Sequence, residues 1–325
     1  MSDLTSQTGA ASNSVVASAV QYSGLGGDEV ISLANRSVRG PETGEVRIRV
    51  MAAAVNPTDT LLRHPRFAHT AFPLTPGMDA AGIVDAIGEG VSRLSVGDEV
   101  MAAVGPLRPE GGAQATYIVI PAASAVPKPR GVTFSEAATI PMNGLTAIHA
   151  LDVAELSAGQ TLAVTGGAGW LAYLTVVLAK LRGLRVVADA KRAEVELVRG
   201  YGADVVLDRD EPFAEAVRRE FPAGVDALID TALLGETVFS ALKDRGIYIP
   251  VRGWRDEPDP RIQIKVVHVN NVLERTDWLE ELRDLVASGK ILPRVAREYP
   301  PQQVAEAQRL LLSGGVRGRP VIIFG

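Results

Sequence analysis

The chain has 325 residues, of which 46% are hydrophobic and 22% charged, so it can bury a large core in one or two domains. Its formal net charge of −5 comes without a long run of one sign, which argues against a general binder of nucleic acid or anionic membranes. Cysteine is absent, which excludes disulfides, thiolate nucleophiles, iron–sulfur ligation and zinc sites that use sulfur.

The N-terminal segment, residues 1–14, is small and polar and lacks the basic and apolar regions of a signal peptide. We expect a disordered tail there. No apolar run in the chain approaches the roughly 20 residues that span a bilayer. We therefore expect a cytoplasmic protein that does not bind membranes.

Residues 15–126 consist of short apolar runs separated by Gly, Pro and Asp turns, a pattern that predicts a β-rich domain. The runs are VVASAVQY, EVRIRVMAAAV, AAGIVDAIG, DEVMAAV and QATYIVI. Pro127 and Pro129 follow the last run and mark a domain boundary.

Residues 127–262 change to short apolar strands that alternate with helical stretches, which predicts an α/β domain with a parallel sheet covered on both faces. A capping box formed by Thr133 and Glu136 begins the helix that leads into this domain. The expected strands are TLAVT, LRVVA, ADVVL, VDALID and GIYIPV, and the expected helices cover 170–181, 193–200, 213–221 and 236–243.

The last part of the chain, residues 263–325, contains two further amphipathic stretches, over 277–288 and 301–313, which predict helices. The final run, RPVIIFG, predicts a strand.

The strand TLAVT leads directly into the glycine-rich turn TGGAGWLA and then into an amphipathic helix. Gly166 permits the tight turn, Gly169 lets the backbone approach a pyrophosphate, and Ala172 is small enough for the helix to pack closely on the strand. The amides near Trp170 and Leu171 would then face the phosphates at the helix N-terminus. The order of strand, turn, helix and strand favours a dinucleotide site, and a purely structural turn is the alternative.

Trp170 is an unexpectedly large residue in this turn. Its side chain can point outward without blocking the backbone donors. In that position it would cover the cofactor or pack against the neighbouring domain.

The choice of dinucleotide depends on the residues that follow the next strands. Asp189 ends the second strand, where a carboxylate can bind the ribose hydroxyls of NAD and repel a 2′-phosphate. Lys191 and Arg192 come directly after it, and Arg209 follows the third strand. Such cations suit the 2′-phosphate of NADPH, although each can equally be a solvated surface charge. We expect NADPH, with NADH as the alternative.

Several segments together resemble, in order and spacing, the medium-chain dehydrogenases/reductases, and in particular their zinc-free quinone oxidoreductase-like branch. They are NPTD (56–59), TPGMDAAGIVDAIGEGVSRLSVGDEV (75–100), IPMNGLTAIHAL (140–151), TGGAGWLA (165–172), LVASGKILP (285–293) and GGVRGRPVII (314–323). The resemblance implies a Rossmann doubly wound parallel sheet domain (127–262) and a GroES-like β-rich catalytic domain assembled from 15–126 and 263–325. It also implies an active-site cleft at their junction and a homodimer.

Zinc is not expected. In zinc-dependent relatives the segment PGMDAAG carries a His-Glu pair, where this chain has Met78 and Asp79. Those relatives also have cysteine ligands and a separate structural zinc loop with four cysteines. This chain has no cysteine and lacks that loop. Without a metal as Lewis acid, dehydrogenation of a plain alcohol loses its usual route.

The resemblance points to three candidate catalytic residues. Asn56 is a candidate to donate its amide to the acceptor or to hold the nicotinamide ribose, and Asp59 borders the same cleft, with backbone bonding in a turn as its alternative role. Asn143 opens a helix that faces the nicotinamide in the family, with helix capping as its alternative. Thr146 matches a family threonine near the nicotinamide carboxamide. Many relatives carry a tyrosine as candidate proton donor where this chain has Leu61.

These features predict an NADPH-dependent, zinc-free oxidoreductase that transfers hydride to a quinone or to an activated C=C bond of an enone, enal or enoyl thioester. Such a site needs donors for the charge that develops on the acceptor oxygen. Tyr248 and Trp254 can line the acceptor pocket, with core packing as the alternative. A non-catalytic NADPH-binding redox sensor or structural dimer is the alternative function, and Leu61 is its support.

Overall fold

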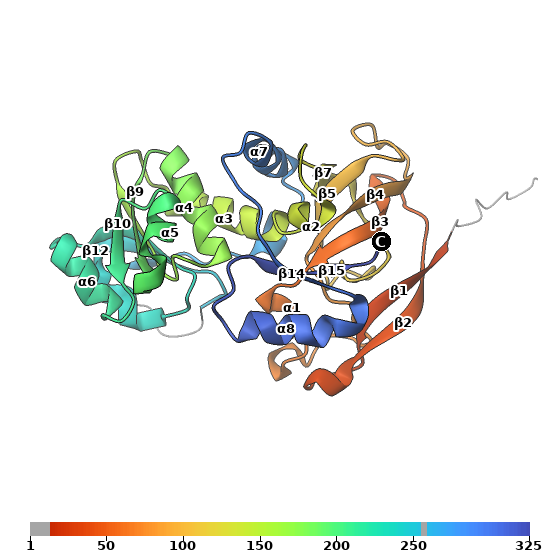
Figure 1. The fold of residues 1–325 in the computed structure, drawn as a ribbon, viewed down its shortest axis with the longest axis horizontal. Coiled ribbons are helices and arrows are strands. Elements are labelled where there is room, and N and C mark those ends of the chain that lie inside the picture. The colour runs from red at the N-terminus through yellow and green to blue at the C-terminus, as the bar shows by residue number, and fades with distance from the viewer. Residues whose placement is uncertain (1–13, 255–258) are drawn as a thin grey trace, which may run out of the picture.

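The computed structural model describes residues 14–254 and 259–325, which form two lobes with helix α3 (Pro141–Ala154) between them (Figure 1). One lobe contains a parallel sheet and the other contains antiparallel strands. The predicted combination of an α/β domain and a β-rich domain is confirmed. Residues 1–13 of the predicted tail lie outside the described residues.

The nucleotide lobe is built on a six-stranded parallel sheet in the order β10-β9-β8-β11-β12-β13. In chain order this is the third, second, first, fourth, fifth and sixth strand of the lobe, the arrangement of a Rossmann sheet. The strands are β8 (Thr161–Val164), β9 (Arg185–Ala190), β10 (Val205–Asp208), β11 (Val225–Asp230), β12 (Leu242–Pro250) and β13 (Gln263–Ile264).

Helices cover both faces of this sheet, as its continuously apolar strands predict. Successive residues of β8 show the two faces: Leu162 joins the core shared with α3 and α4, and Ala163 joins the core shared with α6. The helices of this lobe besides α3 are α4 (Trp170–Leu181), η4 (Arg192–Glu194), α5 (Val195–Gly200), α6 (Phe213–Glu220) and η5 (Gly235–Ala241).

One helix prediction in this lobe is wrong at its end. The expected helix over 236–243 is a 3-10 helix that ends at Ala241, and Leu242 already begins β12. Leu242 pairs with Val225 of β11 in parallel register. Pairing with a strand 17 positions earlier in the chain therefore overrides the local helical pattern.

The β-rich lobe contains a seven-stranded sheet in the order β14-β15-β3-β4-β5-β7, with β6 also pairing to β3, and a separate antiparallel pair β1-β2. The last strand of the chain, β15, therefore inserts between β14 and the N-terminal strand β3. The strands are β1 (Val15–Tyr22), β2 (Ile31–Val38), β3 (Glu45–Ala54), β4 (Asp79–Ile87), β5 (Glu99–Ala103), β6 (Tyr117–Pro121), β7 (Ala125–Pro127), β14 (Val295–Tyr299) and β15 (Arg319–Ile323).

Both ends of the chain thus contribute to one sheet, and Figure 1 shows the C-terminus beside β3. The domain limits themselves (15–126, 127–262 and 263–325) stay a prediction. The helices associated with this lobe and with the junction are η1 (Asp28–Val30), α1 (Pro57–Leu61), η2 (Pro65–Phe67), η3 (Ala122–Ser124), α2 (Phe134–Ala137), η6 (Val269–Asn271), α7 (Thr276–Ala287), η7 (Pro301–Gln303) and α8 (Val304–Leu312).

The lobes share one continuous apolar core around α3, α4 and α7. Leu145 of α3 and Leu282 of α7 are fully buried in it, and Gly144 has no room for a side chain because an added Cβ would lie 2.4 Å from a methyl of Leu282. The predicted capping box of Thr133 and Glu136 begins α2 at this junction. Within the described residues, no helix is long and apolar enough to cross a membrane.

Candidate active site

The crevice at the junction lies where the order of the parallel strands reverses, between β8 and β11. The two strands are parallel, but α4 after β8 and η5 after β11 pack on opposite faces of the sheet, so the loops after the two strands diverge and leave room for a ligand. A cavity of about 130 Å³ opens there. Its lining comes from both lobes and includes Thr146, Leu171, Thr231, Val251, Arg252 and Arg319.

The glycine turn after β8 has the geometry that the sequence predicts. Gly166 adopts φ +70°, a left-handed conformation that favours glycine. Gly167, which the sequence reasoning did not single out, lies against β9: an added Cβ would be 2.5 Å from the carbonyl oxygen of Asp189. At Gly169 an added Cβ would meet only the carbonyl oxygen of Gly166, at 3.1 Å. The turn therefore folds tightly against β9 and is open around Gly169.

The amides that can receive a phosphate lie one step further along the chain than Gly169. The Gly169 amide itself donates to the Gly166 carbonyl at 2.8 Å, and the first intrahelical bond of α4 runs from the Tyr173 amide to the Gly169 carbonyl. The amides of Trp170, Leu171 and Ala172 precede that bond and have no intrahelical acceptor. They form the positive end of a 12-residue helix at the crevice, a fitting site for a dinucleotide pyrophosphate.

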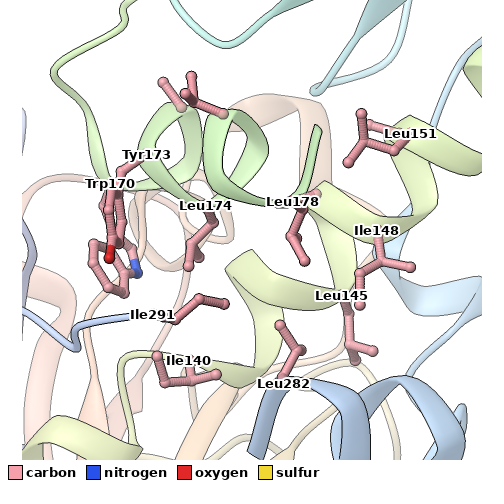
Figure 2. Packing of buried hydrophobic residues seen from close by; sticks show 14 of the residues in the cluster. Ile140, Leu145, Ile148, Leu151, Trp170, Tyr173, Leu174, Leu178, Leu282 and Ile291 are labelled. Carbon is pink, nitrogen blue, oxygen red and sulfur yellow. The ribbon is translucent and has the colours of Figure 1, made fainter. Parts of the chain in front are cut away.

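The outward position considered for the Trp170 side chain is wrong. The residue is 2% exposed, and its indole N–H donates to the Thr139 carbonyl at 2.8 Å. Its ring stacks on Tyr173 with 5.3 Å between centroids, and Figure 2 shows both rings at the N-terminal end of α4. The tryptophan therefore anchors α4 to the segment before α3 and packs in the apolar core that the two lobes share, the packing role that the sequence leaves open for it. Ala172 is fully buried, as close helix–sheet packing requires.

Asp189 is the penultimate residue of β9, and both of its carboxylate oxygens accept hydrogen bonds. Oδ1 accepts from the amides of Gly166 (2.6 Å) and Gly167 (3.3 Å), and Oδ2 accepts from Nε of Arg209 (2.5 Å). The carboxylate thus holds the glycine turn and is neutralised by an arginine. Lys191 and Arg192 are exposed beside this pair and form no ion pair with any described residue. A separate cavity of about 400 Å³ is lined by Asp189 and Arg209.

A buried polar network underlies the crevice and joins four elements. Asn56 is its centre: its Nδ2 donates to Oδ2 of Asp79 at 2.5 Å, and its Oδ1 accepts from Nδ2 of Asn143 at 3.0 Å and from Nε of Arg319 at 2.9 Å. Nη2 of Arg319 also donates to Oδ1 of Asn143 at 2.7 Å. All four side chains are buried, and Asn143 and Arg319 line the crevice.

Asp59 lies beneath this network and does not line the crevice. Its carboxylate accepts from the amides of Asn56 (2.8 Å) and Gly77 (3.0 Å) and from Nε2 of Gln114 (3.2 Å). These bonds are the backbone bonding in a turn that the sequence leaves as the alternative for Asp59. They tie α1 to the turn before β4, so Asp59 can act on the crevice only by positioning Asn56.

Two carboxyl groups and one guanidinium are buried together at this point. Burial raises the pKa of both Asp59 and Asp79 to about 7, and the neighbouring charge of Asp79 adds to the rise for Asp59. The Met142 amide, the Asn56 side chain and the charge of Arg319 oppose the rise for Asp79. Burial lowers the pKa of Arg319 to about 10, so this residue stays a cation at neutral pH.

The substitution Asp79→Asn should reveal the raised pKa of Asp79 through the pH dependence of the free energy of unfolding. The folded carboxyl keeps its proton up to about pH 7, and the unfolded one releases it near 3.8, so its contribution to stability is present at low pH and is lost as the pH rises through that window. From about pH 5 to about pH 8, the free energy of unfolding of the variant should improve relative to the wild type by about 2–3 kcal/mol. Urea unfolding at several pH values measures this difference.

The cost of the mismatched amide at position 79 does not depend on pH, so it cancels in this comparison. A difference between variant and wild type that stays constant from about pH 5 to about pH 8 would show that Asp79 titrates normally.

The remaining predicted residues on α3 are both near the crevice. Asn143 bonds through its side chain to Asn56 and Arg319, so the helix-capping alternative is wrong; Ile140 is the N-cap of α3. Thr146 lines the crevice, and its hydroxyl donates to the Met142 carbonyl at 2.7 Å.

Three residues of the site escape the sequence reasoning. Arg319 could have been noticed as the charged residue in the otherwise apolar strand RPVII. Asp79 enters the sequence analysis only as the residue that replaces a zinc ligand. Arg252 follows β12 without any local pattern that marks it. Leu61, by contrast, lines a different surface pocket with Leu25 and His64, so its side chain is not part of this crevice.

A Rossmann sheet, an open helix N-terminus behind a glycine turn and a crevice between two lobes define a dinucleotide-dependent dehydrogenase or reductase. Residues 42–130 match the alcohol dehydrogenase GroES-like domain, and residues 201–322 match the zinc-binding dehydrogenase family. The chain belongs to the medium-chain dehydrogenases/reductases, in the quinone oxidoreductase-like group, and is an oxidoreductase that uses a nicotinamide cofactor.

Similar proteins of known sequence and structure support this assignment. The chain is 33% identical to the chloroplastic NADPH-dependent alkenal/one oxidoreductase of Arabidopsis thaliana, over 93% of this chain and 78% of the relative. It is 30% identical to the 2-methylene-furan-3-one reductase of Solanum lycopersicum, over 93% of this chain and 77% of the relative. The quinone oxidoreductase from Coxiella burnetii has a similar structure, with a TM-score of 0.81 and 25% identity over 96% of this chain and all of that one.

One of the matched families is described as zinc-binding, yet the part of the chain that the structure describes does not form a zinc site. Residues 14–254 and 259–325 contain no group of three or more His, Cys, Asp or Glu side chains that could hold a metal ion. Met78 cannot replace a histidine ligand, and Asp79 is committed to Asn56 and to the Met142 amide at 2.6 Å.

Proposed function

We propose that the protein is an NADPH-dependent, zinc-free reductase that transfers hydride to a quinone or to the activated C=C bond of an enone, enal or enoyl thioester. The single observation that carries this proposal is the buried Arg319 cation, which faces the crevice beside the open N-terminus of α4. Two of the similar proteins are an alkenal/one oxidoreductase and a 2-methylene-furan-3-one reductase, which supports the same class of acceptor.

The crevice meets the chemical demand of this reaction. When bound, the reduced nicotinamide supplies a hydride. Negative charge then develops on the acceptor oxygen, and donors held in fixed positions stabilise it. Arg319 uses one N–H each on Nε, Nη1 and Nη2 for Asn56, Gly318 and Asn143, which leaves two of its five N–H groups for the crevice. Asn143 likewise has a second amide hydrogen.

Protonation of the acceptor does not require a dedicated side chain here. The acceptor oxygen of a quinone takes its proton from water without a demand on carbon geometry, and an enolate held by Arg319 can be protonated by solvent that reaches the crevice. Asn56 and Asp59 act in this proposal as positioning residues, because both are buried beneath the residues that line the crevice.

A panel of acceptors tests the proposed activity. Loss of nicotinamide absorbance is followed by stopped flow with quinones, enones, enals and enoyl thioesters, with NADPH and with NADH. Turnover of at least one class is expected. Tight binding of NADPH without turnover of any member would instead support the non-catalytic redox sensor or structural dimer.

The preference for NADPH is assigned to Arg209, Lys191 and Arg192, which gather at the ends of β9 and β10. Arg209→Gln is expected to weaken NADPH binding by about 10–100-fold, since it removes a charge-assisted bond and leaves the Asp189 carboxylate unneutralised near the 2′-phosphate. NADH binding should change far less, because NADH has no 2′-phosphate. Calorimetric titration with both nucleotides measures the two dissociation constants.

A matched control for this variant is Arg182→Gln. It removes an equally charged side chain that pairs with Asp152 and lies at the C-terminal end of α4, whereas the glycine turn lies at the N-terminal end. It should leave both dissociation constants unchanged. Equal losses of NADPH and NADH affinity in Arg209→Gln would show that Arg209 only supports the fold.

The homodimer and the cytoplasmic location expected from the sequence stay predictions. Light scattering of the purified protein tests the first, and a fluorescent fusion in the source cell tests the second.

A further inference from the structure

A second cavity, of about 520 Å³, adjoins the crevice. It opens beyond the ends of β11 and β12, and its lining includes Arg252, Gly253, Trp254 and His268. The loop of the β-rich lobe adds Arg66 from η2. Arg252 also lines the crevice, so the two cavities meet at this side chain.

The lining of this cavity is cationic. None of the described residues that line it carries a carboxylate. The guanidinium groups of Arg66 and Arg252 make no ion pair and no hydrogen bond with any described residue, although that of Arg66 lies 5.7 Å from the ring centre of Phe67. Burial and, to a smaller degree, the charge of Arg66 lower the pKa of Arg252, so the two like charges are close enough to repel each other.

A buried donor without an acceptor among the described residues lies beside the cavity. Nε1 of Trp254 is shielded from solvent and has no hydrogen-bond partner among the described residues. The ring is fixed edge-on against Tyr248, with 5.3 Å between centroids, so the N–H cannot turn freely to find one. Because solvent does not reach this N–H, it is the ring of Trp254 that lines the cavity, beside the two arginines.

The other two arginines near the cofactor crevice differ in this respect. Arg209 is paired with Asp189, and Arg319 with two asparagines. Arg66 and Arg252, from different lobes, instead face a shared cavity to which no described residue contributes a counter-charge. That arrangement is unfavourable in the free protein and becomes favourable when an anion lies between them.

We propose that this anion pocket, formed by Arg66, Arg252, Trp254 and His268, binds a carboxylate or phosphate group of the acceptor. The acceptor would then be an electron-poor carbonyl compound that carries an acidic tail. This inference rests on the proposed function, because it assigns the tail of the same acceptor whose reactive end lies in the crevice.

Pairs of acceptors that differ only in charge test the anion pocket. A series of linear enones with a terminal carboxylate is compared with the corresponding methyl esters, and a second series carries a terminal phosphate monoester. We expect kcat/KM to be at least about tenfold higher for the acid than for the ester at one chain length. The carboxylate and phosphate series show which anion the pocket prefers.

Substitutions of single arginines test whether the preference for the acid over the ester depends on the anion pocket. Arg66→Gln should lower the ratio of acid to ester kcat/KM by about tenfold, because the charge of the acid loses one of its partners. Arg130→Gln removes the charge of another exposed arginine that lines neither cavity, and it should leave the ratio unchanged.

The outcomes separate the two proposals. No turnover of acid, ester or any other member of the acceptor panel refutes the proposed function. Turnover of other acceptors but of neither the acid nor the ester refutes the anion pocket alone. Turnover of both with equal kcat/KM in the wild type refutes the anion pocket and leaves the proposed function standing. A higher dissociation constant for NADPH in Arg66→Gln, with the ratio of acid to ester unchanged, would assign the pocket to the cofactor and also refute the inference.

Discussion

Replacing Arg319 with glutamine is expected to lower kcat/KM by about 10²–10³-fold for every acceptor, since it removes the cation that faces the developing charge on the acceptor oxygen. The same change leaves Asp79 and Asp59 buried without a cation, so the free energy of unfolding should fall by about 3–5 kcal/mol. Steady-state kinetics and urea unfolding measure the two effects separately. Loss of activity in a variant that is folded at the assay temperature is the expected result.

Arg319→Lys provides the matched control, because it keeps the charge and loses the forked geometry. A lysine cannot donate at once to Asn56 and Asn143 in the way that Nε and Nη2 of the arginine do. It should recover most of the stability and only part of kcat/KM. Full activity in Arg319→Gln would show that the cation serves the fold alone, and the observation that carries the proposed function would be lost.

The nucleotide lobe could be predicted from the sequence because its signals are local. The apolar strands, the glycine turn and the helix over 170–181 follow one another within a few residues, and the helix bounds agree with α4. A turn that needs a left-handed residue at Gly166 must place glycine there, so the sequence reveals the conformation directly.

The polar network could not be predicted in the same way. Asn56 and Arg319 are separated by 263 positions, and Asn143 and Arg319 by 176. Each residue taken alone resembles an ordinary turn, cap or surface residue. Only the insertion of β15 beside β3 brings them together, and this pairing depends on tertiary packing that no local pattern records.

Large side chains were also difficult to place from sequence. Trp170 follows a glycine turn, and its position among small residues suggested an outward ring. The structure instead buries the ring because Thr139 offers a carbonyl acceptor and Tyr173 offers a flat apolar face. Both partners are determined by how α3 and α4 pack, so the direction of the ring is a property of the junction between the lobes.

The expected effect of Gly167→Ala follows from the closest backbone approach in the glycine turn. The new Cβ would lie 2.5 Å from the carbonyl oxygen of Asp189 and 2.9 Å from the Cβ of Ala188, both on strand β9. Neither atom is the end of a flexible side chain, so the turn must move away from the strand. That movement would break the bonds from the Gly166 and Gly167 amides to Asp189 and misplace the N-terminus of α4.

We therefore expect Gly167→Ala to weaken the binding of NADPH and NADH alike, by at least about tenfold, since both share the pyrophosphate that α4 would bind. Gly200→Ala is the matched control, because an added Cβ there meets no atom within 4 Å, and it should leave both dissociation constants unchanged. Calorimetric titration of the two variants measures this. Unchanged affinity in Gly167→Ala would mean that the pyrophosphate does not lie at this turn, and the assignment of hydride transfer to the adjoining crevice would lose its geometric basis.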